Sequence, residues 1–400
     1  MAKVGTTLAA GGTPWRLCQA PDVNGDRIAD YIVATPYIGR VFPAAGGVHV
    51  LSGVDGSQLS EIAGSGAAEL MGYCVAPFVD QNGDGRREVL VGSPGDSVYG
   101  SHPGRVEVVS LVDGAVLSSW HGKAIWDEYG CAIATLSDMD KDGIPEVLIG
   151  ASESTLLRAG FAEVRSGETG RSLLTVTGDK PGDQFGYSVG AAMSLDENDE
   201  AMFAVGAPQR GTSAGDSLGY VKIYSGLSGK AKVTALGAPG QTAFGSAIGF
   251  VSDVDGDGHA DMIVAAPLDS RSVQLGGSVS LVSSQNGDRL ATFAGDRSGE
   301  RCGTSIAVIG DVTGDGMVEV AVGCPGSGNG RVVVLSGSDL SLIGEVAGES
   351  NGDWFGQSIS CVTDIDGDGL DDIFVAAPSA LLGNATGYAR VVSSCFARHR

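Results

Sequence analysis

A short acidic motif recurs along the chain at an almost constant interval, and this repetition constrains the fold more than any other feature. The separations between successive copies are 58, 58, 115, 58 and 53 residues, and 115 is about twice 57.5, so one copy is hidden in the long gap. The chain of 400 residues is therefore predicted to contain seven similar units. The copies begin at Asp22 (DVNGDRIAD), Asp80 (DQNGDGRRE), Asp138 (DMDKDGIPE), Asp253 (DVDGDGHAD), Asp311 (DVTGDGMVE) and Asp364 (DIDGDGLDD).

Two further markers support this register. A proline follows the start of the motif by 14 residues in five copies, as in Pro267, and the hidden fourth unit has Pro208, which places the start of its loop at Ser194. An aromatic or large residue followed by glycine precedes the motif by nine residues, as in Phe244-Gly245. Three markers with one spacing indicate a single structural unit repeated along the chain.

The segments between the markers are typical of β-strands. The unit around Asp253 has short apolar runs at 245–251, 262–266, 277–282 and 289–294, joined by glycine-rich turns. Glycine makes up 64 of the 400 residues, and each glycine inside a helix costs about 1 kcal/mol relative to alanine. The chain is therefore predicted to be all-β, with four antiparallel strands in each repeat, the pattern of a β-propeller.

A Phe-Gly pair, an acidic loop and a Gly-Ala-Pro-like turn such as Val205-Gly206-Ala207-Pro208 follow one another in each unit. This order resembles the FG-GAP repeat of integrin α-subunit β-propellers and their prokaryotic relatives, over essentially the whole chain. The resemblance implies one domain, a seven-bladed β-propeller with metal loops on one face and partner-binding loops on the other. The expected blades are residues 13–66, 67–127, 128–182, 183–241, 242–299, 300–352, and 353–396 together with 1–12.

The last unit has a third strand at 387–392 and then lacks a fourth strand. Residues Val4 to Ala10 resemble the fourth strand of other units. We therefore expect the amino-terminal segment to supply the outermost strand of the last blade, which closes the ring and protects an otherwise open sheet edge.

The acidic loops place oxygen-bearing side chains at positions 1, 3, 5 and 9, with glycine at position 6 in five of six. Position 7 varies freely, as expected where only a backbone carbonyl is used. Several carboxylates held together repel one another unless a cation lies between them, and an all-oxygen site of this kind favours Ca²⁺. An EF-hand is excluded because position 12 is apolar, as in Val264, where that motif requires glutamate. The predicted ligands are Asp22, Asn24, Asp26, Ile28 and Asp30; Asp80, Asn82, Asp84, Arg86 and Glu88; Asp138, Asp140, Asp142, Ile144 and Glu146; Asp253, Asp255, Asp257, His259 and Asp261; Asp311, Thr313, Asp315, Met317 and Glu319; and Asp364, Asp366, Asp368, Leu370 and Asp372.

Departures from the pattern predict unequal sites. Arg27 replaces the glycine of the first loop, and Thr313 replaces an acid or amide in the sixth unit, so both sites are expected to be weaker. The fourth unit has Ser194, Asp196, Asn198 and Met202 at the aligned positions and is expected to bind no calcium. Six calcium sites are predicted, and their even distribution favours structural staples over a catalytic centre.

The net charge of −23 comes from 48 acids and 25 bases, and 21 of the acids are predicted metal ligands. A charge of this sign repels nucleic acid phosphates, so no nucleic-acid partner is expected. The sequence has no apolar stretch long enough to span a membrane. The first residues, Met1-Ala2-Lys3-Val4-Gly5, lack the apolar run of a secretory signal, so the protein is expected to be intracellular or to have had its signal removed. Because millimolar calcium is extracellular, we expect the protein outside the cell or on its surface, although free thiols would also suit the cytoplasm.

The leading functional hypothesis is a non-enzymatic, monomeric module for adhesion or protein interaction, which binds a protein or glycan on the face opposite the calcium loops. The alternatives are a lectin, a polysaccharide lyase or hydrolase, and a structural surface scaffold. Cys74, Cys131 and Cys361 are expected to be small buried residues, without a disulfide framework. The resemblance places the ligand loops at 37–46, 95–104, 152–160, 209–219, 268–276 and 379–387, together with segments such as 119–128. The candidate contacts are Tyr37, Phe42, Tyr99, Trp120, Trp126 and Arg210.

Overall fold

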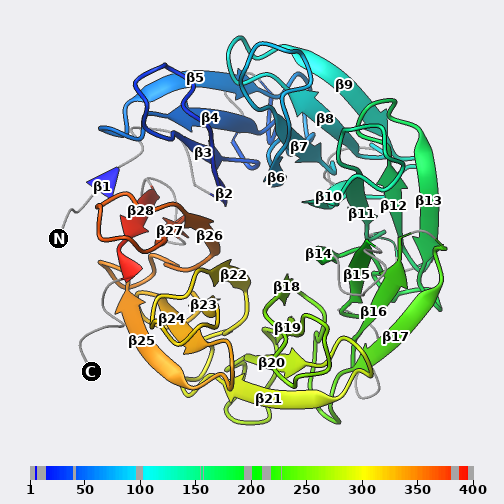
Figure 1. Cartoon of the computed structure of the whole chain (residues 1–400), viewed down its shortest axis with the longest axis vertical. Coiled ribbons are helices and arrows are strands. Elements are labelled where there is room, and N and C mark those ends of the chain that lie inside the picture. Colours follow the sequence, from blue (N-terminus) through cyan, green and yellow to red (C-terminus); the bar gives the residue numbers. More distant parts are fainter. Residues whose placement is uncertain are drawn as a thin grey trace. The chain divides into compact units, whose positions relative to one another are not determined.

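The structure is a computed structural model that describes residues 5–6, 15–38, 42–95, 102–153, 155, 157–192, 201–209, 218–226, 228–379 and 387–394. The regular elements of these residues are β-strands, β1 to β28 (Figure 1). None of the described residues form a helix long and apolar enough to cross a membrane. The chain separates into two compact units, residues 10–189 and residues 1–9 with 190–400, and each is described by itself.

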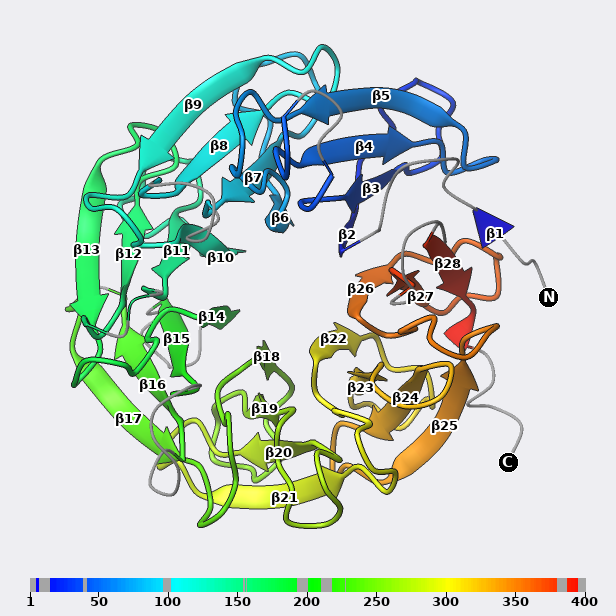
Figure 2. The same cartoon turned by 180° about the vertical axis from the view of Figure 1, so that it is seen from behind.

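The unit of residues 10–189 contains three four-stranded antiparallel sheets, in which each strand pairs with the next along the chain (Figure 2). The sheets are β2 (Arg16–Gln19), β3 (Tyr31–Ala34), β4 (Gly47–Leu51) and β5 (Gln58–Ala63); β6 (Cys74–Pro77), β7 (Val89–Ser93), β8 (Arg105–Val109) and β9 (Val116–His121); and β10 (Tyr129–Thr135), β11 (Val147–Ala151), β12 (Phe161–Arg165) and β13 (Ser172–Thr177).

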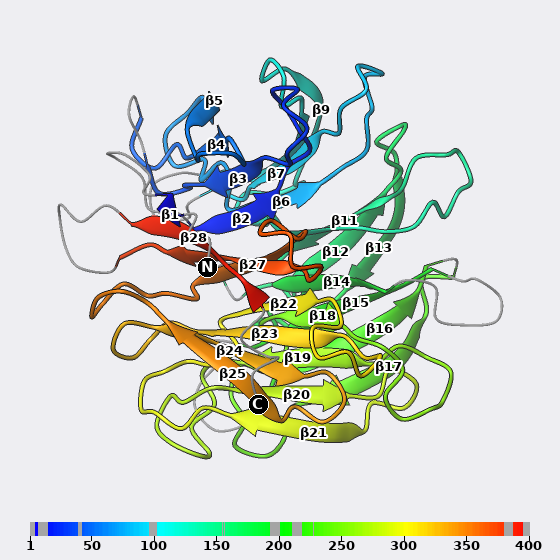
Figure 3. The same cartoon turned by 60° about the vertical axis from the view of Figure 1, so that its left-hand side comes forward.

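The unit of residues 1–9 and 190–400 contains four more such sheets, and Figure 3 shows β18 to β25 as two stacks of four strands. The strands are β14 (Ser188–Ala192), β15 (Met202–Ala207), β16 (Tyr220–Ser225) and β17 (Ala231–Leu236); β18 (Ile248–Phe250), β19 (Met262–Ala266), β20 (Ser278–Val282) and β21 (Arg289–Ala294); β22 (Ser305–Ile309), β23 (Glu319–Cys324), β24 (Arg331–Ser336) and β25 (Leu342–Ala347); and β26 (Ser358–Val362), β27 (Asp372–Ala377), β28 (Tyr388–Val392) and β1 (Gly5–Thr6). The prediction of an all-β, seven-bladed β-propeller with four antiparallel strands per blade is confirmed.

Burial differs between the strands of a blade. The second strand is buried along its whole length in every blade, and the third strand is mostly buried, as in β19 and β20, whereas the fourth strand β21 alternates between half-buried and exposed residues. Continuous apolar runs are expected where both sheet faces are covered, and alternation where one face meets solvent. The core of each blade therefore lies in its middle two strands.

The Phe-Gly marker joins one blade to the next. Gly104, just before β8, forms a parallel bridge with Tyr129, and five other blades make the equivalent contact. The backbone of Gly104 has φ +81°, and a Cβ at this position would lie 2.3 Å from the carbonyl oxygen of Tyr129, so glycine is required. The residues at the aromatic position are all buried, namely Met71, Tyr129, Phe185, Phe244, Cys302 and Phe355.

The amino-terminal strand completes the last blade, as predicted. Gly5 and Thr6 of β1 pair with Arg390 and Ala389 of β28, in the sheet order β1-β28-β27-β26. The remaining residues of the predicted 4–10 segment lie outside the described residues. Because β1 covers β28, the last blade has the same four-strand composition as the others.

One disulfide, between Cys302 and Cys324, was not expected from the sequence. Cys302 occupies the aromatic position of the Phe-Gly marker and Cys324 the alanine position of the Gly-Ala-Pro-like turn, where another blade packs Phe244 near Ala266 in one core cluster. A covalent bond therefore replaces an apolar contact within this blade. Cys131 is a buried free thiol, as expected, whereas the free thiols Cys74 and Cys361 are half-buried and not fully buried as the sequence predicts.

Candidate metal centre

The six acidic loops each connect the first strand of a blade to the second, as in the loop from β18 to β19. Because the two strands are antiparallel neighbours, each loop is the tip of a hairpin at the same end of its own blade. Flanking strands replace the helices of an EF-hand. The local structure is therefore the β-hairpin acidic loop that the sequence predicts.

The carboxylate at position 1 organises the loop by accepting backbone N–H groups. Asp253 accepts hydrogen bonds from Gly256 at 2.7 Å, Asp257 at 3.2 Å and Gly258 at 2.9 Å. Each of the other five loops makes at least two such bonds, and this wrapping turns the chain around the first carboxylate. These acceptors are Asp22, Asp80, Asp138, Asp311 and Asp364.

Position 6 adopts a left-handed backbone in all six loops. It is glycine in five of them, with φ of 89° at Gly258, whereas Arg27 of the first loop has φ of 74°. A residue with a Cβ in this conformation costs about 1–2 kcal/mol. The first loop therefore forms the same turn at a higher conformational cost.

The carboxylate at position 9 lies at the base of the loop, out of contact with water. Its side chain accepts a hydrogen bond from the backbone N–H of position 2, as from Val254 to Asp261 at 2.9 Å. The bond recurs in all six loops, and the relative exposure of these residues is only 0–2%. The residues are Asp30, Glu88, Glu146, Asp261, Glu319 and Asp372.

Burial raises the pKa of most of these position 9 acids. For Asp372, burial followed by the nearby carboxylates of Asp366 and Asp368 raises the pKa to about 6, against an opposing hydrogen bond from Ile365. The same two causes raise the pKa of four others. They are Glu88, Glu146, Asp261 and Glu319. Buried carboxylates with raised pKa values are groups that a bound cation would stabilise in the charged form.

Carboxylates from different positions converge in four loops, where three oxygens lie within 4.8 Å of one another. No ion pair connects a basic side chain of the described residues to these acids. In the first two loops position 3 is Asn24 or Asn82, whose amide donates to the position 5 aspartate at 2.8 or 3.2 Å. The converging groups are Asp138, Asp140 and Glu146; Asp253, Asp255 and Asp257; Asp311, Asp315 and Glu319; and Asp364, Asp366 and Asp372.

The first loop differs from the others through a contact with the second. The guanidinium group of Arg86, at position 7 of the second loop, donates to the carbonyl oxygen of Val23 in the first. Desolvation raises the pKa of Asp22, but backbone hydrogen bonds from Arg27, Gly25 and Asp26 outweigh it. The positive charge of Arg86 adds to this lowering of the pKa. The first loop therefore lies beside two arginines, of which the sequence shows only Arg27.

A second set of buried polar residues lies at the opposite end of the blades and was missed by the sequence analysis. Each accepts backbone N–H groups of its own loop, as Glu69 does from Ser65 at 2.9 Å. Most also contact a donor side chain, for example Arg105 with Glu69 at 3.0 Å and Arg158 with Asp127 at 2.6 Å. A fixed offset of two residues before the Phe-Gly marker, or three at Gln241, could have identified them. The residues are Glu69, Asp127, Asp183, Gln241, Glu300 and Asp353.

The candidate ligand-contact residues have different environments. Tyr37, Phe42 and Trp126 are exposed, with relative exposures of 45%, 42% and 41%. The expectation for Trp120 is wrong, because this residue of β9 is 7% exposed and packs in the core of its blade. Tyr99 and Arg210 lie outside the described residues, as do Ser194, Asp196 and Asn198 of the fourth unit, whereas Met202 begins β15.

Comparison with known proteins supports this account of the repeats. The family model of the FG-GAP repeat matches residues 244–282 and 355–392. Two of the seven blades are FG-GAP repeats. The chain is 31% identical over 207 residues to integrin alpha-7 of Rattus norvegicus, covering 48% of this chain and 17% of that protein. It is 30% identical over 215 residues to integrin alpha-4 of Xenopus laevis, covering 50% and 20%.

Human integrin alpha-7 gives a similar match, 31% over 208 residues, with 48% of this chain and 17% of the human protein covered. The matched region thus spans about a fifth or less of these integrin α relatives. The FG-GAP matches, the integrin α relatives and the seven four-stranded blades together support the resemblance of this chain to an integrin-like FG-GAP propeller.

Proposed function

We propose that this chain is a calcium-binding β-propeller that acts as a non-enzymatic ligand-binding module for adhesion or protein interaction. The observation that supports the calcium sites is the buried carboxylate at position 9, which faces other acids in the same loop without a cation from the described residues. A loop of this kind is costly when empty of positive charge. Its construction is repeated in six hairpins.

The donor set fits Ca²⁺. In the loop of Asp253 the ligands would be the side chains of Asp253, Asp255, Asp257 and Asp261, with the carbonyl of His259. Calcium takes six to eight oxygen ligands in flexible geometry, whereas magnesium demands near-octahedral geometry and retains water. Bound calcium would neutralise the loop acids, and the chain's own N–H groups would hold positions 1 and 9 in place for it. The metal would act as a staple of the hairpin.

The ligand-binding role rests on the opposite end of the blades. There the loops between second and third strands carry exposed aromatic residues, among them Tyr37 and Phe42. Amphipathic aromatics are enriched at protein-binding hot spots. The integrin α relatives carry the name of a cell-surface adhesion family, so we place this chain outside the cell, as a monomer and a single domain over residues 1–400.

Calcium titration by calorimetry tests the metal sites. We expect six calcium ions per chain, and Asp261→Asn should lower the stoichiometry by one. A stoichiometry of zero would overturn the calcium proposal. Ligand binding is tested separately by probing protein and glycan arrays with the calcium-loaded chain. Selective binding to protein ligands supports the interaction module, whereas binding confined to glycans favours the lectin, and binding to neither overturns the proposed role.

A further inference from the structure

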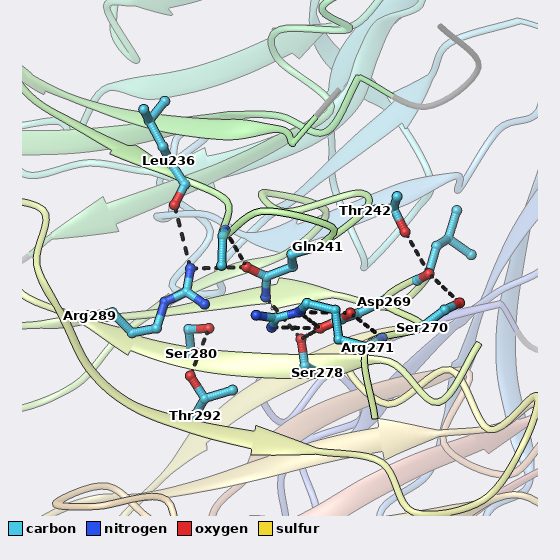
Figure 4. Close-up of polar contacts among 12 residues, drawn as sticks. Leu236, Gln241, Thr242, Asp269, Ser270, Arg271, Ser278, Ser280, Arg289 and Thr292 are labelled. Atoms are coloured by element: carbon cyan, nitrogen blue, oxygen red, sulfur yellow. Dashed lines mark hydrogen bonds and ion pairs between the residues drawn. The ribbon is translucent and has the colours of Figure 1, made fainter. Parts of the chain in front are cut away.

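The loop before the fifth blade differs from the equivalent loops of other blades, which carry a buried acid at the end opposite the acidic loops. Gln241 stands where five other blades have a buried aspartate or glutamate, and its Oε1 accepts the backbone N–H of Ala238 at 2.9 Å as those acids do. The amide therefore keeps the loop geometry but supplies no negative charge. Figure 4 shows that Gln241 lies between two arginine side chains, Arg271 and Arg289.

Arg289 begins the outer strand β21 and is half-buried. Its Nη2 atom makes both of its hydrogen bonds, to Gln241 Oε1 at 3.0 Å and to the carbonyl of Leu236 at 3.5 Å. Its guanidinium group also lies over the Phe244 ring, 5.5 Å from the centroid. Within the described part of the chain no carboxylate forms an ion pair with Arg289, and its Nε and Nη1 atoms make no hydrogen bond to a described residue.

The neighbouring acid is already used by the other arginine. Asp269, which is 4% exposed, accepts from Arg271 Nε at 3.0 Å and Arg271 Nη2 at 2.8 Å, and from the Ser278 hydroxyl at 2.7 Å. Gln241 donates to the same Ser278 at 3.0 Å. Burial, followed by the charge of Arg271, lowers the pKa of Arg289. Asp269 thus pairs with Arg271 and not with Arg289, in a chain whose net charge is −23.

The sixth blade shows what the missing acid does. Arg331 contacts Glu300, which occupies the position of Gln241, and also pairs with Glu345 and with Asp296 at 2.7 Å. In this loop the protein supplies every carboxylate that the arginine requires. The fifth blade has Gln241 at the position of Glu300 and Ser278 at the position of Arg331, and Arg289 reaches Gln241 from the fourth strand instead.

We propose that Arg289, Gln241 and Arg271 form an anion site that binds the carboxylate of an aspartate or glutamate side chain from a protein partner. The proposal rests on the proposed function, because it names the chemistry of a ligand for that face. A guanidinium group presents a planar pair of donors that matches a carboxylate. The arginines at equivalent loops in this chain, Arg105 and Arg331, are held by carboxylates, which favours an acidic side chain over the sulfate of a glycan.

The test is a titration of the calcium-loaded full chain with N-acetyl-glutamate amide, followed by the NMR signal of the Arg289 Nε–H group. We expect a saturable shift of this signal. The Nε–H signal of Arg331 should not move, because its carboxylates are already in place. Sodium sulfate is titrated in parallel. Saturation by sulfate alone would overturn the carboxylate proposal and favour a sulfated glycan.

Two variants isolate the site. Gln241→Glu supplies the missing acid internally and should weaken binding of the glutamate probe at least about tenfold, a change of about 1.4 kcal/mol. Arg289→Gln lacks the Nε–H group that reports binding, so it is compared with wild type by calorimetry, in which the variant should show no binding of the glutamate probe. The matched control, Arg297→Gln, removes an exposed arginine of the segment between β21 and β22 that already contacts Glu345 at 3.5 Å, and should leave binding unchanged. Equal binding by wild type and Gln241→Glu, with unchanged melting temperature, would refute the site.

The same variants separate this inference from the proposed function. If array ligands bind wild type and Gln241→Glu equally well, the interaction module stands and the anion site fails. If the glutamate probe saturates Arg289 but no array ligand binds, the anion site stands and the proposed function fails. Binding of an acidic protein ligand that is lost in Gln241→Glu supports both.

Discussion

The two ends of each blade solve the problem of a buried carboxylate in different ways. At the end opposite the acidic loops, Glu69 meets Arg105, and its pKa is held below the usual range by that arginine and by Ser65, against desolvation. In the acidic loops, Asp261 is equally buried but faces other acids, and burial raises its pKa. Both side chains are carboxylic acids. The difference shows that a buried acid depends on where its positive charge comes from, and in our proposal the acidic loops leave this role to calcium.

Removing calcium should have the largest effect on stability, because only the acidic loops are proposed to depend on a bound ion. Each occupied site stabilises the fold by about 2.7 kcal/mol at calcium 100 times its dissociation constant. EDTA should therefore lower the melting temperature by at least about 10 °C, since several sites are emptied together. Scanning calorimetry with and without calcium measures the change. Equal melting temperatures would mean that the loops do not need an ion.

Charge removal at the two ends should then give opposite patterns. Asp261→Asn should cost about 2–3 kcal/mol in calcium, through loss of one site, and little or nothing in EDTA, because it relieves repulsion. Glu300→Gln should cost about 1–3 kcal/mol in both conditions, because Arg331 loses a buried partner whether or not calcium is present. Urea unfolding of both variants in both buffers measures the four values. A calcium-dependent cost for Glu300→Gln contradicts the comparison.

The pH dependence of stability should change sign with calcium. An acid whose pKa is raised by folding binds a proton more tightly in the folded state, so the metal-free protein should gain stability as pH falls from about 7 to about 5, through the pKa of Asp372 at about 6. Asp22 and Asp311 have lowered pKa values and lose their stabilising effect only at lower pH. In calcium the protons compete with the ion, and stability should fall instead. Urea midpoints at several pH values test both slopes.

The smallest effect is expected within the acidic loops themselves. Arg86→Gln removes a positive charge from beside the first loop and should raise its calcium affinity about threefold, because the charge is partly screened by solvent. Arg87→Gln, an exposed neighbour, is the matched control and should change little. Calcium calorimetry on both variants gives the comparison. An unchanged first site in Arg86→Gln would show that Arg27 alone distinguishes this loop.

The periodic features of the fold could be predicted because each marker recurs with a fixed spacing. Phe244-Gly245, the acidic loop and Pro267 define one blade, and the missing fourth strand after β28 predicts the pairing of β1. The buried base of each loop follows from the same spacing. Because the markers recur, a wrong assignment in one blade would disagree with the spacing in the other six.

The departures could not be predicted, because they depend on contacts between loops and on the direction of single side chains. The reach of Arg86 to Val23 and the position of Gln241 between two arginines involve residues from different hairpins. The sequence predicts Trp120 to lie in a ligand loop, but it belongs to strand β9 and its side chain is buried in the core. The Cys302–Cys324 bond could have been predicted from the sequence, since both residues occupy motif positions of one blade.

The pairing of β1 with β28 has a consequence for the synthesis of the protein. Gly5 pairs with Arg390, so 385 residues must be made after the first strand before its partner exists. At about 5–20 residues per second this delay is roughly 20–80 seconds. During that time β1 has left the ribosome but has no partner strand. The last blade is complete only when β28 has been synthesised and pairs with β1.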